Sequence, residues 1–451
     1  MMKYKTLELP YEISSENYFQ LIKHQDWPVF LNSNQNEYTE QRYDIISCNP
    51  FEKILVDQKG PWITTSNSTS KLTSNPMIVL QDVMSKYKCD YNSEIPFCGG
   101  AIGFMSYDLG KLFQGINIGK DDILFPLMAF GIYDWALIHD HQIKKAYVVY
   151  HDWNEIISNL KLFSTKHREK TERPIFKMIS SCESNMNYDI YKSKLNKILD
   201  YIKKGDCYQV NFSQRFSLGY SGDEFELYMN LNEKFAAPYS SFISYPFGKI
   251  LSFSPERFLS VTNKVVETKP IKGTRRRSHN YKEDNENIRQ LKNSSKDRAE
   301  NLMIVDLLRN DLSMNCKLGS IKVEKLFEIE TFANVHHLVS TIKGEIDDQS
   351  NIYSLIKDAF PGGSITGAPK IRSMEIIEEL ELSNRSVYCG SIGYISFDET
   401  VDLNISIRTM LGIENQLYFW GGGGIVNDSD IKSEYYETLD KVKPLLDTFS
   451  D

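Results

Sequence analysis

The segment Pro270-Ile271-Lys272-Gly273-Thr274 holds a lysine between a proline and a glycine. Pro270 has a fixed φ, and Gly273 has no Cβ that would keep a ligand away from the backbone. A lysine held in such a pocket can lose its charge by desolvation and act as a nucleophile, or keep its charge and bind a carboxylate. The segment alone leaves both roles open for Lys272, beside the default of a solvated surface lysine.

Two expected helices each carry a pair of carboxylates three residues apart. Asp297 and Glu300 form the first pair, and Glu434 and Glu437 form the second. Residues with this spacing lie on one helical face, so each pair presents its oxygens together. Hard oxygen ligands without nearby His or Cys favour Mg²⁺, which takes one or two protein carboxylates together with substrate oxygens and water. Two solvated helix faces are the alternative at this point.

Two glycine-rich segments offer backbone N–H groups to an anion. The run Gly421–Gly424 is expected to form a turn from a strand into a helix. It lacks the Lys and Ser or Thr of a phosphate-binding P-loop and the spacing of a dinucleotide fingerprint, so it does not indicate nucleotide binding. The second segment, residues 361–370, carries two hydroxyls, and a plain connecting loop is its alternative.

Two strands are expected to present further polar side chains. Neighbouring residues of a strand face opposite sides, so one of His336 and His337 can reach a site while the other packs. Arg408 is expected on the polar face of a strand that starts at Val401. An arginine there is either solvated or binds a carboxylate with its two-pronged guanidinium.

The chain divides into three regions that must position these residues. Residues 1–150 contain short apolar runs broken by Asn, Ser, Asp and Gly, which predict a strand-rich N-terminal region. Residues 151–186 are polar and mixed, which is typical of a linker. Residues 187–451 combine helical and strand patterns and hold all the candidate residues named above.

The third region shows four elements clearly. An amphipathic helix is expected over residues 188–202 with Gly205 as its C-cap, and a strand over residues 208–216 follows. A second helix is expected over residues 294–312, and a third from Ser429, its expected N-cap.

Composition narrows the class of protein. The chain has 451 residues, 41% hydrophobic and 25% charged, as in a globular protein that buries a large core. Its net charge of −8 argues against general affinity for nucleic acid or an anionic membrane. No apolar run reaches the roughly 18 residues of a membrane span. Seven cysteines without metal-binding spacing indicate reduced thiols in a cytoplasmic protein.

Six segments together carry a family resemblance: Ser254–Phe258, Pro270–Thr274, Glu300–Asp311, His337, Gly367–Lys370 and Gly421–Gly424. In this order they closely resemble the chorismate-utilising enzymes, the superfamily of anthranilate, aminodeoxychorismate, isochorismate and salicylate synthases. The resemblance covers residues 185–445, and residues 96–110 add a match to the aminating members. It implies an α+β protein with the anthranilate synthase component I-like fold, in which two large antiparallel β-sheets stack with helices packed outside.

Three features refine the resemblance. Water-using members carry a lysine base where this chain has Gln209. An amide cannot deprotonate water, so ammonia is the implied nucleophile. Anthranilate synthases generally have alanine at the position of Lys272, whereas aminodeoxychorismate synthase component I has lysine. The run Ala237–Phe242 also departs from the anthranilate synthase pattern. The chain therefore resembles the aminodeoxychorismate synthase component I group.

That resemblance implies replacement of the C4 hydroxyl of chorismate by an amino group. The product would be 4-amino-4-deoxychorismate, on the route to 4-aminobenzoate and folate. Lys272 would attack C2 as the hydroxyl leaves, and Glu256 would protonate the leaving oxygen. Ammonia would then add at C4 as the lysine departs.

The same matching implies roles for the remaining candidates. Glu300 and Glu437 would ligate Mg²⁺, with Asp297 and Glu434 in support. The residues expected to contact chorismate are Gln209, Gly273, Thr274, His337, Ser364, Tyr388, Arg408, Gly422, Gly423, Gly424 and Lys441.

Ammonia is expected from a separate glutaminase subunit, component II, because the chain lacks the Gly-x-Cys-x-Gly turn of an amidotransferase nucleophile. Some family members bind tryptophan in the first region, and Leu31-Asn32-Ser33 is a faint counterpart of that site. Two alternatives are an anthranilate synthase component I and a catalytically inactive scaffold that senses chorismate or tryptophan. The second would have lost Glu256 or a metal carboxylate, and the sequence retains them.

Overall fold

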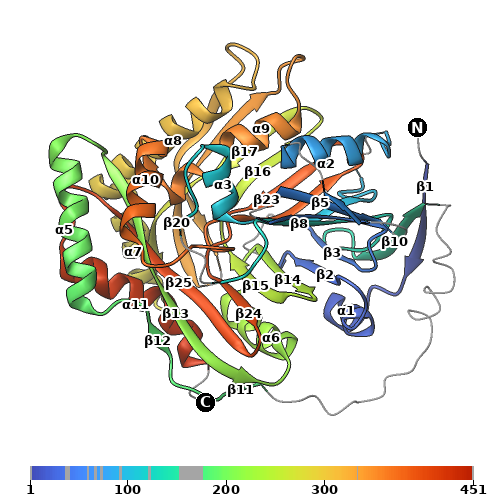
Figure 1. Ribbon diagram of the computed structural model, residues 1–451, viewed down its shortest axis with the longest axis horizontal. Coiled ribbons are helices and arrows are strands. Elements are labelled where there is room, and N and C mark those ends of the chain that lie inside the picture. Colours follow the sequence, from blue (N-terminus) through green and yellow to red (C-terminus); the bar gives the residue numbers. More distant parts are fainter. Residues whose placement is uncertain are drawn as a thin grey trace.

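The computed structural model describes residues 3–35, 41–57, 60–65, 69–71, 75–90, 94–119, 123–151, 176–332 and 334–448. The strands among these residues form two large antiparallel sheets, with helices around them (Figure 1). Within the described residues, no helix combines the length and the apolar character needed to cross a bilayer.

The first sheet joins the N-terminal region to the strands that carry the glycine run. In spatial order it contains β1 (Tyr4–Leu9), β10 (Lys145–His151), β9 (Trp135–Asp140), β3 (Tyr43–Ser47), β2 (Val29–Asn32), β14 (Tyr239–Tyr245), β15 (Gly248–Ser254), β24 (Thr409–Ile413), β25 (Gln416–Ile425), β13 (Gln209–Ser221) and β11 (Lys177–Met178). Two short strands, β12 (Glu183–Ser184) and β21 (Gly367–Ala368), also pair with β13.

The second sheet carries Lys272 near one edge. Its order is β18 (Ile271–Arg276), β20 (Val335–Glu345), β17 (Val265–Lys269), β16 (Arg257–Thr262), β23 (Val401–Asn404), β22 (Ser391–Ser396), β7 (Gly100–Met105), β8 (Met128–Tyr133), β4 (Glu52–Asp57), β5 (Gly60–Thr65) and β6 (Thr69–Lys71), with β19 (Lys322–Thr331) also paired to β20.

Each sheet contains strands from both sides of the expected linker. In the first sheet β2 pairs with β14, and in the second β7 pairs with β22. Residues 152–175 of that linker lie outside the described residues, while β11 and β12 fall inside its C-terminal part. The division into regions 1–150, 151–186 and 187–451 stays a prediction about the sequence.

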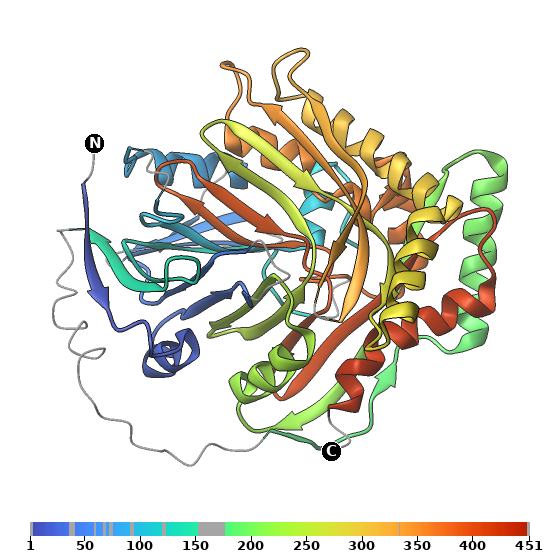
Figure 2. The same cartoon turned by 180° about the vertical axis from the view of Figure 1, so that it is seen from behind.

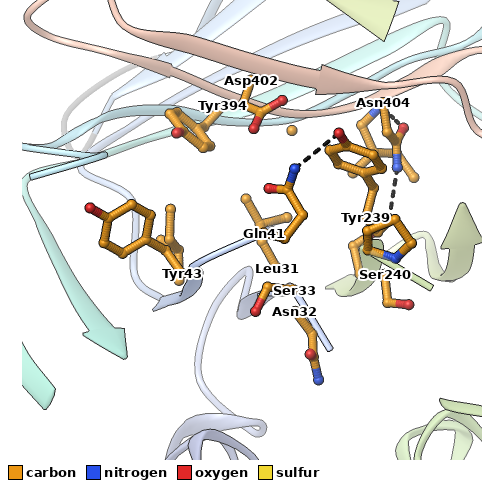
Figure 3. Close-up of a pocket in the computed structure, with 15 residues that line it drawn as sticks. Leu31, Asn32, Ser33, Gln41, Tyr43, Tyr239, Ser240, Tyr394, Asp402 and Asn404 are labelled. Atoms are coloured by element: carbon orange, nitrogen blue, oxygen red, sulfur yellow. Dashed lines mark hydrogen bonds between the residues drawn. The ribbon is translucent and has the colours of Figure 1, made fainter. Parts of the chain in front are cut away.

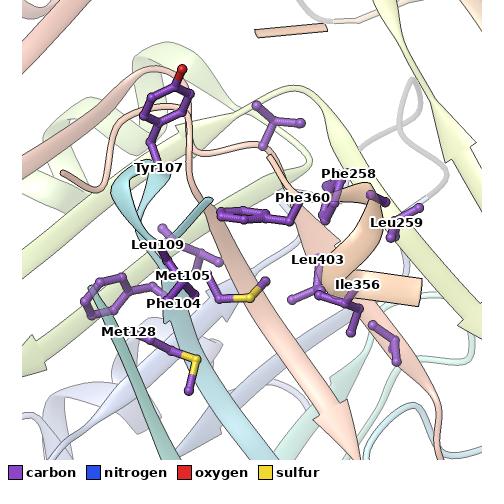
Figure 4. Packing of buried hydrophobic residues seen from close by; sticks show 14 of the residues in the cluster. Phe104, Met105, Tyr107, Leu109, Met128, Phe258, Leu259, Ile356, Phe360 and Leu403 are labelled. Atoms are coloured by element: carbon purple, nitrogen blue, oxygen red, sulfur yellow. The ribbon is translucent and has the colours of Figure 1, made fainter. Parts of the chain in front are cut away.

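Buried apolar side chains from strands of the second sheet pack with those of the segments around it (Figure 4). Every residue of β7, β8 and β22 is buried, because both faces of these strands are covered. Phe258 and Phe360 meet edge to face, with ring centroids 5.8 Å apart. This contact holds the segment after Glu256 against the loop that leads to Ser364, and so helps to place two candidate residues.

Helices cover the outside, as both views show (Figures 1 and 2). Those nearest the candidate residues are α5 (Tyr188–Lys204), α7 (Tyr281–Asn293), α8 (Ser295–Ser313), α10 (Lys370–Leu380) and α11 (Ile431–Asp447). The others are α1 (Ser15–Ile22), α2 (Pro76–Ser85), α3 (Tyr107–Phe113), α6 (Glu224–Phe235), α9 (Ile352–Ala359) and the short 3₁₀ helix η1 (Gly363–Ile365). The expected α+β class, with two stacked sheets and outer helices, is confirmed.

Local signals in the sequence located the C-terminal end of α5 and the N-terminal end of α8. Gly205 caps α5 with a left-handed φ of 81°, and the Ser294 hydroxyl caps α8 by accepting from the Asp297 N–H. The expected cap of α11 was wrong by one residue, because Asp430 accepts from the Ser433 N–H. Ser429 instead donates its hydroxyl to Glu434, so it supports a site carboxylate.

The expected turn at the glycine run was also wrong. The four glycines lie within β25, paired with Ser213, Phe212 and their neighbours on β13. The ladder from β25 to β24 stops at Phe419, so beyond that point no described strand faces the second edge of β25. Backbone N–H groups along that edge are therefore available to a ligand, whereas the Gly422 carbonyl oxygen accepts from Lys441.

Candidate active site

Lys272 lies on β18 where the pairing with β20 is irregular. Ile271 pairs with Val339, but Thr274 pairs with His337, so the register shifts between them. A bulge of this kind redirects a side chain out of the regular alternation. The Lys272 ammonium donates to the carbonyl oxygen of Ser364 at 3.0 Å and lies 3.1 Å from Glu300 Oε1.

Gly273 permits a close approach, although not the one expected. Its φ is +78°, and a Cβ at this position would lie 2.8 Å from the Asp297 carboxyl carbon and 2.9 Å from Leu291. The missing side chain makes room for Asp297, and the expected contact of Gly273 with a substrate stays a prediction. Asp297 is held there by Arg275, whose guanidinium lies 3.2 Å from its Oδ2.

Glu256 is buried beside the lysine. Burial raises the pKa of its carboxyl, although a hydrogen bond from Ser364, the charge of Lys272 and the Ile271 N–H all act to lower it. A buried carboxyl that holds its proton more firmly can donate that proton to a leaving group. Ser364 contacts both candidate catalytic residues, one with its hydroxyl and the other with its carbonyl oxygen.

Three of the four expected metal carboxylates converge on β25. A Cβ at Gly423 would lie 3.3 Å from Glu434 Oε2 and 3.4 Å from Glu437 Oε1. A Cβ at Gly424 would lie 3.0 Å from Glu300 Oε1. Neighbouring glycines thus let carboxylates from α8 and α11 approach the same stretch of backbone. Asp297 lies in the first turn of α8, before Glu300, and contacts Gly273 instead.

This donor set fits Mg²⁺. No group of three or more His, Cys, Asp or Glu side chains within the described residues is close enough to hold a metal ion alone. Mg²⁺ needs only one or two protein carboxylates when substrate and water supply the other oxygens. Burial raises the pKa of Glu434, and the nearby Glu437 charge adds to the rise. A cation beside these carboxylates would relieve that repulsion.

Lys441 and Gln209 border the carboxylates. The Lys441 ammonium donates to the Gly422 carbonyl oxygen at 2.8 Å and lies 2.8 Å from Glu437 Oε1. Gln209 Nε2 donates to Glu300 Oε1 at 2.6 Å, while the buried Gln209 Oε1 has no hydrogen-bond partner within the described residues. A buried acceptor without a donor is costly, so this oxygen is poised to accept from a ligand.

His337 is the histidine that faces the site. Its Nδ1 shares a hydrogen bond with the Thr274 hydroxyl at 2.9 Å, whereas His336 pairs with Asp284. Burial lowers the pKa of His337 to about 3, with a further contribution from the charge of Arg408. His337 is therefore a neutral hydrogen-bonding group at physiological pH.

The expected position of Arg408 on a strand face was wrong. Strand β23 ends at Asn404, and Arg408 lies in the connection to β24 with a φ of 53°. The alternation breaks because β23 and β24 belong to different sheets, so the chain must cross between them. The half-buried Arg408 guanidinium lies over the Phe235 ring, and no described carboxylate pairs with it. It remains available to a substrate carboxylate.

Tyr388 lies beside the base of the glycine run. Its ring stacks on Trp420 with centroids 5.8 Å apart, and Trp420 directly precedes Gly421. Burial raises the pKa of the Tyr388 hydroxyl well above its usual value, so the phenol is neutral. A neutral phenol can donate a hydrogen bond to a carboxylate.

Sequence reasoning missed the buried pair Arg385 and Glu381. Arg385 donates to both Glu381 oxygens, to the Ile365 carbonyl oxygen at 3.0 Å and to the Asn211 carbonyl oxygen at 2.7 Å. Glu381 in turn accepts from the N–H and hydroxyl of Ser213. The pair thus joins β13 to the helix that carries Ser364. The spacing of Arg385 four residues after Glu381 was the one available signal.

A separate cavity of about 70 Å³ lies between the sheets (Figure 3). Its lining includes Asn32, Ser33, Tyr239, Tyr394 and Asn404. The Gln41 amide donates to the Tyr239 hydroxyl at 3.0 Å across it. The segment that faintly matched a tryptophan site, residues 31–33, therefore lines a cavity.

Comparison with known proteins identifies the family of this chain. A family model described as chorismate binding enzyme matches residues 30–447. The chain belongs to the chorismate binding enzyme family. This membership covers the candidate site and most of the N-terminal region.

Two relatives and one solved structure show where in the family the similarity is strong. Aminodeoxychorismate synthase component 1 of Escherichia coli (strain K12) is 43% identical over 436 residues, which are 96% of this chain and 95% of that protein. Anthranilate synthase component 1 of Acetivibrio thermocellus is 33% identical over 90% of this chain and 86% of that protein. The crystal structure of anthranilate synthase component I from Streptococcus pneumoniae TIGR4 has a TM-score of 0.81 at 31% identity, covering 91% of this chain and 93% of that one.

Proposed function

We propose that this chorismate-binding enzyme is component I of an aminodeoxychorismate synthase, which converts chorismate and ammonia into 4-amino-4-deoxychorismate for 4-aminobenzoate and folate biosynthesis. The observation that carries the proposal is the position of Lys272, whose amine lies between the metal-site carboxylate of Glu300 and the carbonyl of Ser364. The 43% identity to the E. coli protein of that name supports it.

In the proposed reaction, Lys272 acts at C2 of chorismate and Glu256 acts at the hydroxyl on C4. The Lys272 nitrogen, after losing its ammonium proton to solvent, bonds to C2 of chorismate, the ring double bonds shift, and the bond from C4 to its hydroxyl breaks. Glu256 gives its proton to the departing oxygen, which leaves as water. Ammonia then bonds to C4 as the bond between Lys272 and C2 breaks, which returns the lysine.

The remaining residues bind and orient the substrate. Arg408, Tyr388 and the open edge of β25 at Gly422, Gly423 and Gly424 would hold the pyruvyl carboxylate. The hydrogen bond between His337 and Thr274 uses one of their two protons, and the pair would donate the other near the ring.

Magnesium dependence is part of the proposal. Glu300 and Glu437 would hold Mg²⁺, with Glu434 beside them and Asp297 in the first turn of α8, before Glu300. The bound ion would neutralise the ring carboxylate of chorismate. The donor set at β25 supports this assignment, because it offers few carboxylates and leaves the other positions to substrate and water.

A glutaminase subunit would supply the ammonia. The names of the relatives describe a component 1, which supports a second component. Gln209 offers an unpaired amide oxygen beside the site and no base that could activate water. The seven cysteines are all free thiols, which supports the cytoplasm as the working compartment.

Product identification tests the proposal directly. The purified chain is incubated with chorismate, MgCl₂ and an ammonium salt, and the product is separated and identified by mass spectrometry. We expect 4-amino-4-deoxychorismate. Anthranilate would reassign the chain to the anthranilate synthases. Chorismate binding without turnover would favour the inactive sensing scaffold.

A second, ancillary role is proposed for the cavity in Figure 3. Its mixed lining of hydroxyls, amides and tyrosine rings suits the polar and aromatic groups of an amino acid. Because a volume of about 70 Å³ is too small for tryptophan, the Gln41 side chain that bonds to Tyr239 across the cavity would have to move. Calorimetric titration with tryptophan tests it, and an absence of binding heat at millimolar tryptophan would reject it.

A further inference from the structure

Three of the four candidate metal carboxylates each form an ion pair with a different cationic side chain. Lys272 lies 3.1 Å from Glu300, Lys441 lies 2.8 Å from Glu437, and Arg275 lies 3.2 Å from Asp297. Each cation contacts one oxygen of a carboxylate that Mg²⁺ would otherwise bind. A carboxylate with one counter-ion must loosen that contact before it takes another.

The pair between Lys272 and Glu300 is the most enclosed of the three. The exposed fractions of its side chains are 12% and 18%, compared with 50% and 51% for Lys441 and Glu437. Water screens an enclosed pair much less than an exposed one. The same oxygen, Glu300 Oε1, also accepts from Gln209 Nε2 at 2.6 Å.

We propose that Lys272 is the counter-ion of Glu300 in the metal-free enzyme and that Mg²⁺ displaces it, so that binding the metal releases the nucleophile. The inference rests on the proposed function for the role of Lys272, but the competition itself concerns only the two cations and one carboxylate. It assigns Lys272 a function before the reaction starts, and it makes metal binding a precondition for freeing Lys272 from its carboxylate partner.

The surroundings of Lys272 favour a short displacement. Mg²⁺ binds carboxylate oxygens at about 2.1 Å, and a lysine ammonium 3.1 Å from the same oxygen would then face a divalent charge. Lys272 also donates to the Ser364 carbonyl oxygen at 3.0 Å, and this contact does not involve the metal site. Once separated from Glu300, the amine stays tethered on the side of Glu256.

Magnesium affinity measures the competition without any turnover. MgCl₂ is titrated calorimetrically into the wild-type chain, Lys272→Met and Lys296→Met, in the absence of chorismate. Lys296 is the matched control, because its charge attracts Glu300 and Glu434 while it makes no ion pair with either among the described residues. It therefore reports the general effect of removing one positive charge near the site.

We expect the Mg²⁺ dissociation constant to fall about tenfold in Lys272→Met and about twofold or less in Lys296→Met, since only the first variant removes a competing contact. Thermal unfolding of each variant confirms that it is folded. Equal changes in the two variants would overturn the proposal, as would a failure of all three proteins to bind Mg²⁺.

The reciprocal measurement follows the lysine, because coupling between two cations must appear from both sides. The wild-type chain is acetylated briefly with a water-soluble N-hydroxysuccinimide ester, in MgCl₂ or in NaCl of equal ionic strength. Peptide mass spectrometry then compares Lys272 with Lys264, an exposed lysine paired with Asp348.

Acetylation of Lys272 relative to Lys264 should rise at least about threefold in MgCl₂. An unchanged ratio would overturn the displacement. These results are independent of the product assay. If the chain makes 4-amino-4-deoxychorismate but Mg²⁺ and Lys272 do not compete for Glu300, the proposed function stands and only this inference is lost.

Discussion

Lys272 is the residue on which the chemistry depends. Incubation of the chain with chorismate and Mg²⁺ in the absence of ammonia should leave an adduct on this lysine, because the second displacement has no nucleophile. Intact-protein and peptide mass spectrometry detect it, and Lys272→Ala should show none. If turnover proceeds but no adduct is trapped, Lys272 acts as a cation that assists departure of the hydroxyl.

Glu256 should make stability depend on pH. Its folded-state pKa is raised by burial above the unfolded value of about 4.3, so the folded protein holds this proton more tightly. The resulting stability is complete below the unfolded pKa and is lost as pH rises through the folded pKa. We therefore compare the free energy of unfolding of the wild type with that of Glu256→Gln. As pH rises, the wild-type value minus the variant value should fall by about 1.4 kcal/mol per unit of pKa shift.

Denaturant unfolding of both proteins, from about pH 4 to about pH 8, measures this difference. The general-acid role predicts in addition that wild-type kcat decreases with rising pH and that Glu256→Gln loses this dependence. A constant difference in unfolding free energy across the range would mean that the carboxyl is not perturbed.

Metal carboxylates should matter for turnover more than for folding. Replacing Glu300 or Glu437 with Gln should reduce kcat by at least about 100-fold, because the site loses a charged oxygen ligand. Chelation with EDTA should have the same effect and be reversed by added Mg²⁺. Near-normal activity in both variants, or in EDTA, would remove the metal from the mechanism.

The sequence motifs predicted which side chains lie close together, but not how each one is positioned. Lys272, Glu256 and Glu300 come together as expected, since the family resemblance fixed each by a motif. The sequence could not show that the space at Gly273 belongs to Asp297, because the two come from different elements.

At the scale of elements, Arg385 is the residue that joins pieces of the site. Its guanidinium bonds to Glu381, to the carbonyl of Ile365 and to that of Asn211. Arg385→Met would leave a buried, unpaired Glu381 and should cost about 3–5 kcal/mol of unfolding free energy. Arg385→Lys keeps a charge but loses the fork, so it should fold and lose about tenfold in kcat.

Denaturant unfolding and steady-state kinetics on the same preparations separate the two effects. A positioning role predicts that Arg385→Lys stays folded at the assay temperature while kcat falls. Activity lost only in proportion to the unfolded fraction would reduce the pair to a structural one.

Elements with strong local signals were predicted well. Helices α5 and α8 have capping residues and a continuous apolar stripe, so their ends were visible in the sequence. Two errors share one cause, because the strand through Arg408 and the turn at the glycine run were both judged from local pattern. Tertiary pairing decided them: β23 stops where the chain changes sheets, and β13 holds the glycines in a strand.

At the scale of the whole molecule, the chain should need a partner only for glutamine. Ammonium salts should support turnover by the purified chain, whereas glutamine should not until a glutaminase subunit is added. The reason is the missing Gly-x-Cys-x-Gly nucleophile turn. An assay for glutamate release and product, with each nitrogen source, checks this. Product from glutamine and the chain alone would contradict it.

The pairing of β7 with β22 has a consequence for biogenesis. Residues 100–105 leave the ribosome long before residues 391–396, which form the neighbouring strand of their sheet. The unfinished edge of β7 can pair with other nascent or refolding chains in that interval. Contacts this distant in sequence also make folding slow. Renaturation from denaturant should therefore give a yield that falls steeply as protein concentration rises, and a general chaperone present during synthesis should raise the recovered fraction.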